Sequence, residues 1–319
     1  MFAQSERGTI SGLVKDPSGA VIAGARVAVT NTATNQTVSI TTTEAGDYAA
    51  ISLQVGAYRV RVEKDGFRSA VVNGVTVDAA TNARADVTLE VGSTTTAVEV
   101  QAAAVQLATE NAKTSTAVTN KLVDELPLVV SGTLRSPFDL AALTPEAKNL
   151  GGDNGFMLGG GQAASYGTNL DGISANTTRA LSKSWVSTNS PSLEAITEFT
   201  VDTNGFKPEY GHAGGGVMNF VSKSGTNQFH GSAYEFLRNN DFDANNFFNN
   251  RAGLKIPIYK QNDFGASIGG PVRIPKVYKG RDKTFFFFSS EFFRNRAGAT
   301  GFSQSVPTPE MYTGDLAIG

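Results

Sequence analysis

Residues 8–91 contain short runs in which apolar and polar positions alternate, and each run stops at a cluster of turn-forming residues. A period of two is the pattern of a half-buried β-strand. Strands are therefore expected at residues 9–14, 25–30, 37–43, 48–53, 57–62, 71–77 and 83–90. About seven short strands with turns every 8 to 12 residues indicate an all-β sandwich.

A second kind of alternation appears in the last third of the chain, where Phe is abundant. Its runs match the length of about 9 to 11 residues that a strand needs to cross an outer membrane. We expect such strands at residues 228–238, 262–272 and 284–294, with Phe264, Ala266 and Ile268 on one face of the second. The polar segment 239–261 suits an extracellular loop or a lumen lining. A buried sheet in a soluble protein is the alternative.

The middle of the chain is rich in small residues. Residues 93–117, dominated by Ala and Thr, predict a linker with one short strand at 97–101. Helices are expected at 119–126 and 136–143, because a proline follows the first and another lies in the first turn of the second. Further along, an Asp-Gly pair at 171–172 predicts a tight turn after a strand.

Three consecutive glycines at 214–216 raise the question of a phosphate-binding loop. The chain has no Gly-x-x-x-x-Gly-Lys-Ser/Thr motif, and the glycines precede a β-like run. No helix N-terminus would therefore support a phosphate there. Tight turns or a close approach of two backbones are expected instead.

Composition excludes several classes of protein. The 319 residues include 34 Gly, no Cys and two His, His212 and His230. This chain therefore has no disulfide scaffold or Cys-ligated metal site, and little material for a His-based metal centre or hydrolase. A net charge of -2 predicts no nucleic-acid partner. No run of about 18 apolar residues occurs, so no transmembrane helix is expected.

The turns of the first segment follow a recognisable pattern at residues 8–12, 16–25, 46–48, 56–58 and 66–67. This pattern resembles the carboxypeptidase regulatory-like domain, a transthyretin-like fold among the carbohydrate-binding-like sandwiches. The resemblance covers about residues 8–91 and implies a module without catalysis. Three aromatic residues are candidates for a sugar-stacking platform, with packing at strand ends as the more common alternative: Tyr48, Tyr58 and Phe67.

Three runs in the middle of the chain share a second pattern. Its signature residues are Asn169, Leu170, Asp171, Gly172, Glu194, Glu198, Tyr210, Gly211, Gly214, Gly215, Gly216 and Asn219. The pattern resembles the plug domain of TonB-dependent outer-membrane receptors. Residues 197–203 lack that family's usual Lys-Gly-Pro and lead into Asn204-Gly205-Phe206. This variant is typical of Oar-like receptors, whose N-terminal extension is the sandwich domain.

The resemblance implies import of a substrate across the outer membrane, driven by the inner-membrane TonB–ExbB–ExbD complex. TonB would pull on a short TonB box near the plug, pairing with it by strand addition. The best candidate is Ala97, Val98, Glu99, Val100, Gln101 and Ala102, read as an isolated strand in a flexible linker. An ordinary linker strand is the alternative. The substrate is unidentified, a carbohydrate or a peptide being candidates, and no cofactor is expected.

The expected organisation is mainly β. It comprises a tail at 1–7, the sandwich at 8–92, the linker at 93–117, an α+β plug at 118–225 and the first strands of a transmembrane β-barrel at 226–319. Sandwich and plug are expected on the periplasmic side and the barrel in outer-membrane lipid. A plugged barrel takes on the order of 22 strands. We therefore expect the sequence to be the N-terminal piece of a longer receptor, without its signal peptide.

Two other functions remain open. In the first, the sandwich captures a carbohydrate or a protein at the cell surface and the rest is scaffold. In the second, the chain is an enzyme such as a peptidase. For such an enzyme, Asp171 and Glu194 are the only candidate catalytic acids near the glycine turns. Hydrogen bonds to turn amides are a sufficient reason for both residues to be there. Because nucleophile–base pairs and metal-ligand sets are lacking, no enzyme is expected.

Overall fold

The computed structural model describes residues 7–79, 81–92, 97–101, 114–119, 137, 140, 144–149, 156–162, 165–176, 191–206, 210–211, 213–298 and 311. The chain divides into two compact units, which are treated separately below. The first unit spans residues 1–129, 135–233 and 266–290. The second spans residues 130–134, 234–265 and 291–319.

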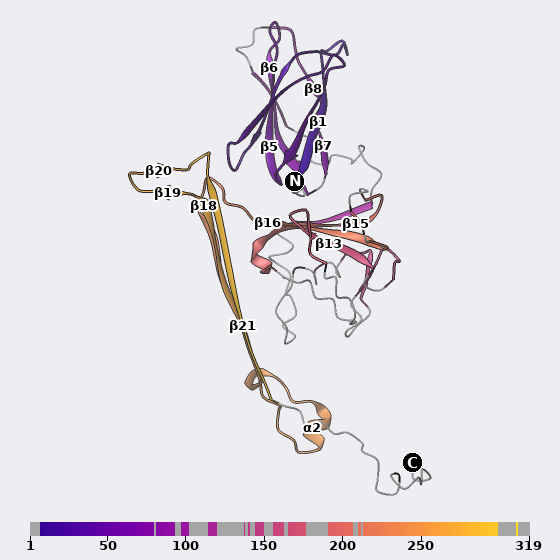
Figure 1. Ribbon diagram of the computed structural model, residues 1–319, viewed down its shortest axis with the longest axis vertical. Helices are drawn as coiled ribbons and strands as arrows, with labels where there is room; N and C mark the ends of the chain where they lie inside the picture. The colour runs from indigo at the N-terminus through magenta and orange to yellow at the C-terminus, as the bar shows by residue number, and fades with distance from the viewer. Residues whose placement is uncertain are drawn as a thin grey trace. The chain divides into compact units, whose positions relative to one another are not determined.

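The N-terminal domain of the first unit is a sandwich of two sheets, coloured indigo to purple in Figure 1. Its strands are β1 (Gly8–Lys15), β2 (Arg26–Asn31), β3 (Thr37–Thr41), β4 (Asp47–Leu53), β5 (Gly56–Glu63), β6 (Ser69–Val77), β7 (Asn82–Arg84), β8 (Val87–Thr88) and β9 (Ala97–Gln101). One sheet has the order β4-β1-β7, with β8 also paired to β1, and the other has the order β3-β2-β5-β6-β9. The sandwich expected from the alternation is therefore present.

One expected strand of the sandwich is divided. The run 83–90 forms β7 and β8, and Asp86 lies between them. The Asp86 side chain accepts a hydrogen bond from the Leu13 N–H at 2.9 Å. A side chain that bonds the neighbouring backbone competes with the regular ladder, which accounts for the break.

The sandwich encloses its own hydrophobic core. Alternation along β2 and β5 turns every second side chain inward, so Val27, Val29, Val60 and Val62 are all completely buried. Residues 10–89 supply every buried member of this core cluster. Full burial of a valine contributes roughly 1.5–3 kcal/mol. These contacts give the domain a core independent of the rest of the chain.

The central domain, also in the first unit, is built on a five-stranded sheet of order β10-β15-β16-β13-β14. Its elements are β10 (Thr114–Thr119), β11 (Ala147–Asn149), β12 (Phe156–Leu158), β13 (Tyr166–Leu170), β14 (Ile173–Ser174), the 3-10 helix η3 (Leu193–Ala195), β15 (Ile196–Asn204) and β16 (Gly216–Ser222). Phe199 and Phe220 are cross-strand partners, and their rings stack at 5.1 Å in the core of this domain.

The start of the central domain differs from the sequence expectation. Strand β10 begins at Thr114, inside the expected linker, and pairs antiparallel with β15. Thr119, where the expected helix would start, is the last residue of this strand. The Thr-rich, β-branched composition of the segment favours a strand. The remainder of the expected helix at 119–126, and most of that at 136–143, fall outside the described residues.

Three long strands at the C-terminal end of the chain form a sheet of order β17-β18-β21 (Figure 1, orange to yellow). They are β17 (His230–Asn239), β18 (Tyr259–Pro271) and β21 (Phe285–Ala297), with 10, 13 and 13 residues. The short strands β19 (Arg273–Ile274) and β20 (Tyr278–Lys279) pair with each other between β18 and β21. Each long strand overlaps one of the strands expected at residues 228–238, 262–272 and 284–294, which confirms these three predictions.

The second unit holds the far ends of these strands and the loop that joins β17 to β18. The loop contains the 3-10 helix η4 (Asn240–Phe242) and the helix α2 (Phe247–Arg251). Asn246 caps α2, since its side chain accepts from the Phe248 N–H at 2.9 Å. The Phe264 and Phe292 rings stack at 5.5 Å on neighbouring strands. Aromatic pairs of this kind fix the pairing of two strands.

The sandwich core allows a test of independent stability. Val60→Ala should lower the free energy of unfolding by roughly 1.5–3 kcal/mol, because the removed methyl groups leave a cavity among buried residues. Val38→Ala on β3 is the matched control, since Val38 is 41% exposed, and it should change stability by under about 0.5 kcal/mol. Urea unfolding of purified residues 7–92 provides the measurement. Equal effects of the two substitutions would contradict the assignment of this core.

Candidate functional site

Three polar side chains, two of them fully buried, connect three strands of the central sheet. The Asn169 amide on β13 donates to the Asn219 side-chain oxygen on β16 at 2.9 Å. The Asn219 amide donates in turn to an Asp202 carboxylate oxygen on β15 at 3.3 Å. Asn219 and Asp202 are 0% and 1% exposed. Buried polar groups are tolerated when they bond one another, so these bonds specify the alignment of the three strands.

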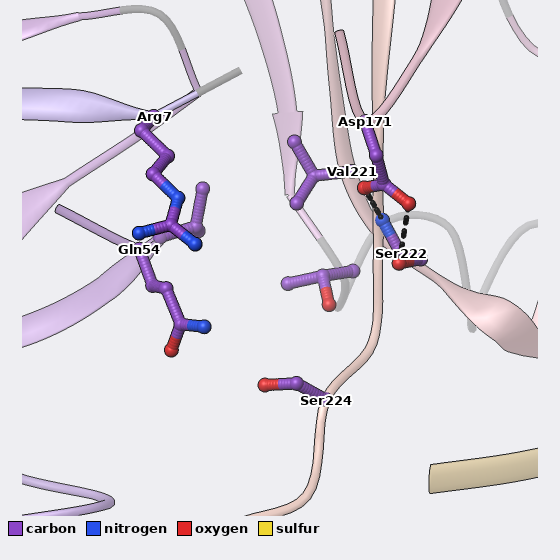
Figure 2. A pocket seen from close by; sticks show the side chains of 8 residues that line it. Arg7, Gln54, Asp171, Val221, Ser222 and Ser224 are labelled. Atoms are coloured by element: carbon purple, nitrogen blue, oxygen red, sulfur yellow. Dashed lines mark hydrogen bonds between the residues drawn. The ribbon is translucent and has the colours of Figure 1, made fainter. Parts of the chain in front are cut away.

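Asp171 closes the hairpin that follows β13. Asp171 and Gly172 both have positive φ, 50° and 78°, as a two-residue hairpin turn requires. The Asp171 carboxylate accepts from the Ser222 N–H at 2.9 Å and from the Ser222 hydroxyl at 2.7 Å. Figure 2 shows both bonds on the wall of a hollow that Ser224 also lines. The expected turn is confirmed, and the carboxylate fixes the end of β16.

Glu194 joins the central domain to the first two C-terminal strands. It belongs to η3, and its carboxylate accepts from the Ser232 hydroxyl on β17 at 2.7 Å. The Ser232 and Ser267 hydroxyls are 2.9 Å apart, which extends the contact to β18. The Lys223 ammonium lies 4.0 Å from the same carboxylate. A bond to a charged acceptor is stronger than a neutral one, so Glu194 carries much of this contact.

Glu198 lies on β15 with only 5% of its surface exposed. Its carboxylate accepts from the Ala79 N–H. Burial raises the pKa of Glu198 to about 7, the Ala79 bond lowers it, and the neighbouring Asp78 carboxylate raises it. Glu198 therefore changes its charge near neutral pH.

The glycine run at the start of β16 permits a close approach of two backbones. The Gly214 and Gly215 N–H groups both donate to the Ser165 carbonyl, at 2.6 and 3.0 Å. A Cβ at Gly215 would lie 2.3 Å from the Leu158 carbonyl oxygen, far inside contact distance. The run leads into β16, which begins at Gly216. The expected close approach is confirmed, and no helix begins here.

The remaining signature residues occupy supporting positions. Leu170 ends β13 and packs against the core of the central domain. Tyr210 is half-buried, and Gly211 has open space around it. His212 lies outside the described residues. The central sheet thus gathers most signature residues around β13, β15 and β16.

The TonB-box candidate lies in a different environment from the one expected. Residues 97–101 form β9, which pairs in parallel with β6 of the sandwich. It is therefore not an isolated strand in a flexible linker. The register joins Ser69 to Ala97 and Asn73 to Gln101. Ala102 lies outside the described residues.

The aromatic candidates for sugar stacking belong to the sandwich core. Tyr48 and Tyr58 are 4% and 3% exposed, and Phe67 packs against the same cluster. The Tyr48 hydroxyl donates to the Ala85 carbonyl, and the Tyr58 hydroxyl donates to the Gln54 carbonyl at 2.7 Å. Burial raises the pKa of both hydroxyls. The two tyrosines cannot offer an open ring face to a sugar, so core packing replaces the stacking hypothesis for them.

Several residues of these contacts were not singled out from the sequence. They are Asp202, Ser222, Lys223, Ser232 and Ser267. Asp202 had no clear signal, because it is one of two acidic residues in a strand that is mostly polar in sequence. The serines had none, since their partners come from distant parts of the chain. Within the described residues, no group of His, Asp and Glu is placed to hold a metal ion, and no helix is long and apolar enough to span a membrane.

The raised pKa of Glu198 predicts a pH dependence of stability. The unfolded chain releases this proton near pH 4.5 and the folded chain near 7. The stabilisation of the fold by the proton on Glu198 is thus complete below about pH 4.5 and is lost as pH rises to about 7. The free energy of unfolding changes by an amount on the order of 3 kcal/mol. Glu198→Gln keeps an acceptor for Ala79 and should remove this loss. Urea midpoints between pH 5 and 8, read from the fluorescence of the single Trp, provide the measurement.

Glu63→Gln is the control for this titration, because Glu63 forms a surface ion pair with Arg61. This variant should retain the pH dependence of the wild-type chain. If Glu198→Gln retains it too, another group is responsible.

Comparison with known proteins identifies both ends of the chain. Residues 9–90 match the family model of the carboxypeptidase regulatory-like domain, and residues 221–319 match that of an outer membrane beta barrel domain. The TonB-dependent transporter Oar of Myxococcus xanthus is 31% identical over 92% of this chain. The chain spans 27% of the length of that relative.

Two solved structures share partial similarity with the chain. The siderophore receptor PirA from Acinetobacter baumannii has 18% identity and a TM-score of 0.37, over 50% of this chain and 22% of the receptor. Catechol 1,2 dioxygenase from Acinetobacter radioresistens has 14% identity and a TM-score of 0.23, over 28% of this chain and 54% of the enzyme. Neither similarity is close enough to support an argument. By sequence, the chain is homologous to the TonB-dependent transporter Oar, and its two ends match a carboxypeptidase regulatory-like domain and an outer membrane beta barrel domain.

Proposed function

We propose that this chain is part of a TonB-dependent outer-membrane receptor that imports a substrate when TonB moves a plug formed by the central domain. The homology to Oar over 92% of the chain is the observation that carries this proposal. The outer membrane beta barrel domain directly follows the central domain in sequence and supports the same function.

The contact at Glu194 supports a plug that is held and then released. One carboxylate bonds Ser232 and approaches Lys223, so a charge-assisted contact joins the central domain to β17. A hydrogen bond to a charged group contributes about 1.5–3 kcal/mol. A contact of this strength holds the plug in its resting position, and it still breaks when a force is applied to the plug.

The C-terminal strands have side chains suited to lipid. Large hydrophobic residues on them are strongly exposed: Phe236, Ile268, Phe288 and Phe292. Exposed apolar groups along strands of this length match the apolar band of an outer-membrane wall. This supports a location of these strands in outer-membrane lipid. The sandwich and the central domain lie on the periplasmic side in this proposal.

Energy for import would come from the TonB–ExbB–ExbD complex acting on residues 97–102. The extended conformation of β9 supports this assignment, because strand addition needs an extended segment. The imported substrate is a carbohydrate or a peptide in this proposal. The buried Tyr48 and Tyr58 give no support to sugar capture by the sandwich.

The TonB box predicts a binding defect. In the full-length receptor, deletion of residues 97–102 should weaken binding of the periplasmic part of TonB at least tenfold, because the segment that pairs with it is gone. Deletion of residues 104–109 from the same linker is the length-matched control and should bind as the wild type does. Titration calorimetry with the purified receptor provides the measurement. Unchanged binding after the first deletion would contradict the assignment.

The Glu194 contact predicts a leak. Ser232→Ala in the full-length receptor removes the donor to Glu194, so the plug should leave its resting position more often. Cells carrying this variant should become at least twofold more sensitive to vancomycin, an antibiotic too large for an intact outer membrane. Ser289→Ala is the matched control, because among the described residues the buried Ser289 hydroxyl has no hydrogen-bond partner. Equal sensitivity of both variants and wild type would exclude this role.

A further inference from the structure

Strand β9 is the last strand of a sheet whose other members all belong to the sandwich. The sheet has the order β3-β2-β5-β6-β9, and β9 runs parallel to β6 from Ser69–Ala97 to Asn73–Gln101. The pairing covers the edge of β6 that faces away from β5. An exposed strand edge invites pairing with another chain, so β9 protects this one.

The strand that supports β9 is firmly held. Strand β6 pairs antiparallel with β5 along most of its length. Ala70 and Val72 of β6 lie in the sandwich core, at 2% and 5% exposed. Strand β6 is held by β5 along one edge and by the core on one face, so it gives the paired strand β9 a defined extended conformation. A five-residue segment alone in water would lose considerable conformational freedom on adopting it.

The chain is also anchored just before β9 begins. The Arg68 N–H donates to the Glu90 carbonyl at 2.8 Å, and the Gly92 N–H donates to the Gly66 carbonyl at 3.1 Å. Arg68 and Glu90 also form an ion pair at 3.2 Å. Only residues 93–96 separate this anchor from β9. So short a connection keeps the strand at high effective concentration next to β6.

Among the described residues, no strand pairs with the other edge of β9, which is the last strand in the sheet order. A β-strand has a hydrogen-bonding edge on each side, so a second partner can pair with β9 while β6 stays in place. The partner best matched to such an edge is an extended segment that adds by main-chain hydrogen bonds.

We propose that the sandwich domain is a docking platform for TonB. It holds the TonB box extended as β9, and a strand of TonB adds to the open edge of β9 as the sixth strand of the sheet. This inference rests on the proposed function, in which residues 97–102 are the TonB box. Its new content is that the sandwich pre-organises the box and that binding does not require the box to leave β6.

A covalent lock provides the test, because the chain contains no Cys. Asn73 and Gln101 are partners in the parallel pair. Neighbouring strands lie about 4.8 Å apart, within the Cα separation that a disulfide accepts. The full chain with Asn73→Cys and Gln101→Cys should therefore form an internal disulfide. Asn73→Cys with Val100→Cys is the control, since successive side chains point to opposite faces, and it should cross-link far less.

TonB binding to the locked chain decides the mechanism. The oxidised chain should bind the periplasmic part of TonB within about twofold of the reduced chain. A synthetic peptide of residues 95–104, which lacks the platform, should bind at least tenfold more weakly. Loss of binding on oxidation with recovery on reduction would overturn the proposal, because it means that β9 must leave β6.

The remaining outcomes separate this inference from the proposed function. If the engineered pair does not cross-link, β9 does not rest on β6 and the platform is wrong, whatever TonB does. If the pair cross-links but TonB binds neither the locked nor the wild-type chain, the TonB-box assignment is wrong and the platform has no TonB to dock. If the peptide binds as tightly as the chain, pre-organisation is excluded.

Discussion

The structure depends on the need of every strand to pair its backbone N–H and C=O groups. Strand β9 forms one edge of a sandwich sheet, next to β6. Strand β10 comes from the same stretch of small residues and forms one edge of the central sheet. The segment between the two domains therefore supplies one edge strand to each of them. The segment that composition predicts to be a plain linker therefore contains two edge strands, one in each of two separate sheets.

Burial imposes a second constraint inside the central domain. Asp202 and Asn219 are enclosed in a sheet core beside the stacked Phe199 and Phe220. Such polar groups are costly unless they are bonded, and the Asn169–Asn219–Asp202 chain meets this need. Only one strand alignment brings the three side chains together. Two of the signature residues that suggested a family, Asn169 and Asn219, therefore also align β13, β15 and β16 through their bonds with each other and with Asp202.

Local sequence patterns predicted the positions of strands and turns better than they predicted which strands and side chains pair. Period-two alternation located the strands of the sandwich and the C-terminal sheet, and Asp171-Gly172 gave its turn, because these features depend on adjacent residues. The pairing of β9 with β6 and the bond from Ser232 to Glu194 join residues far apart in sequence, which no periodicity encodes. Tyr48 and Tyr58 were ambiguous because an aromatic residue at a strand end can face the core or solvent.

The pairing of β9 with β6 has a mechanical consequence. A force along the axis of β9 loads all of its hydrogen bonds to β6 at the same time, in shear. A force across that axis loads them one after another, as in the opening of a zipper, and breaks the pairing at a much smaller pull. The angle at which tension reaches Gln101 therefore determines whether the sandwich resists that tension or lets the strand go.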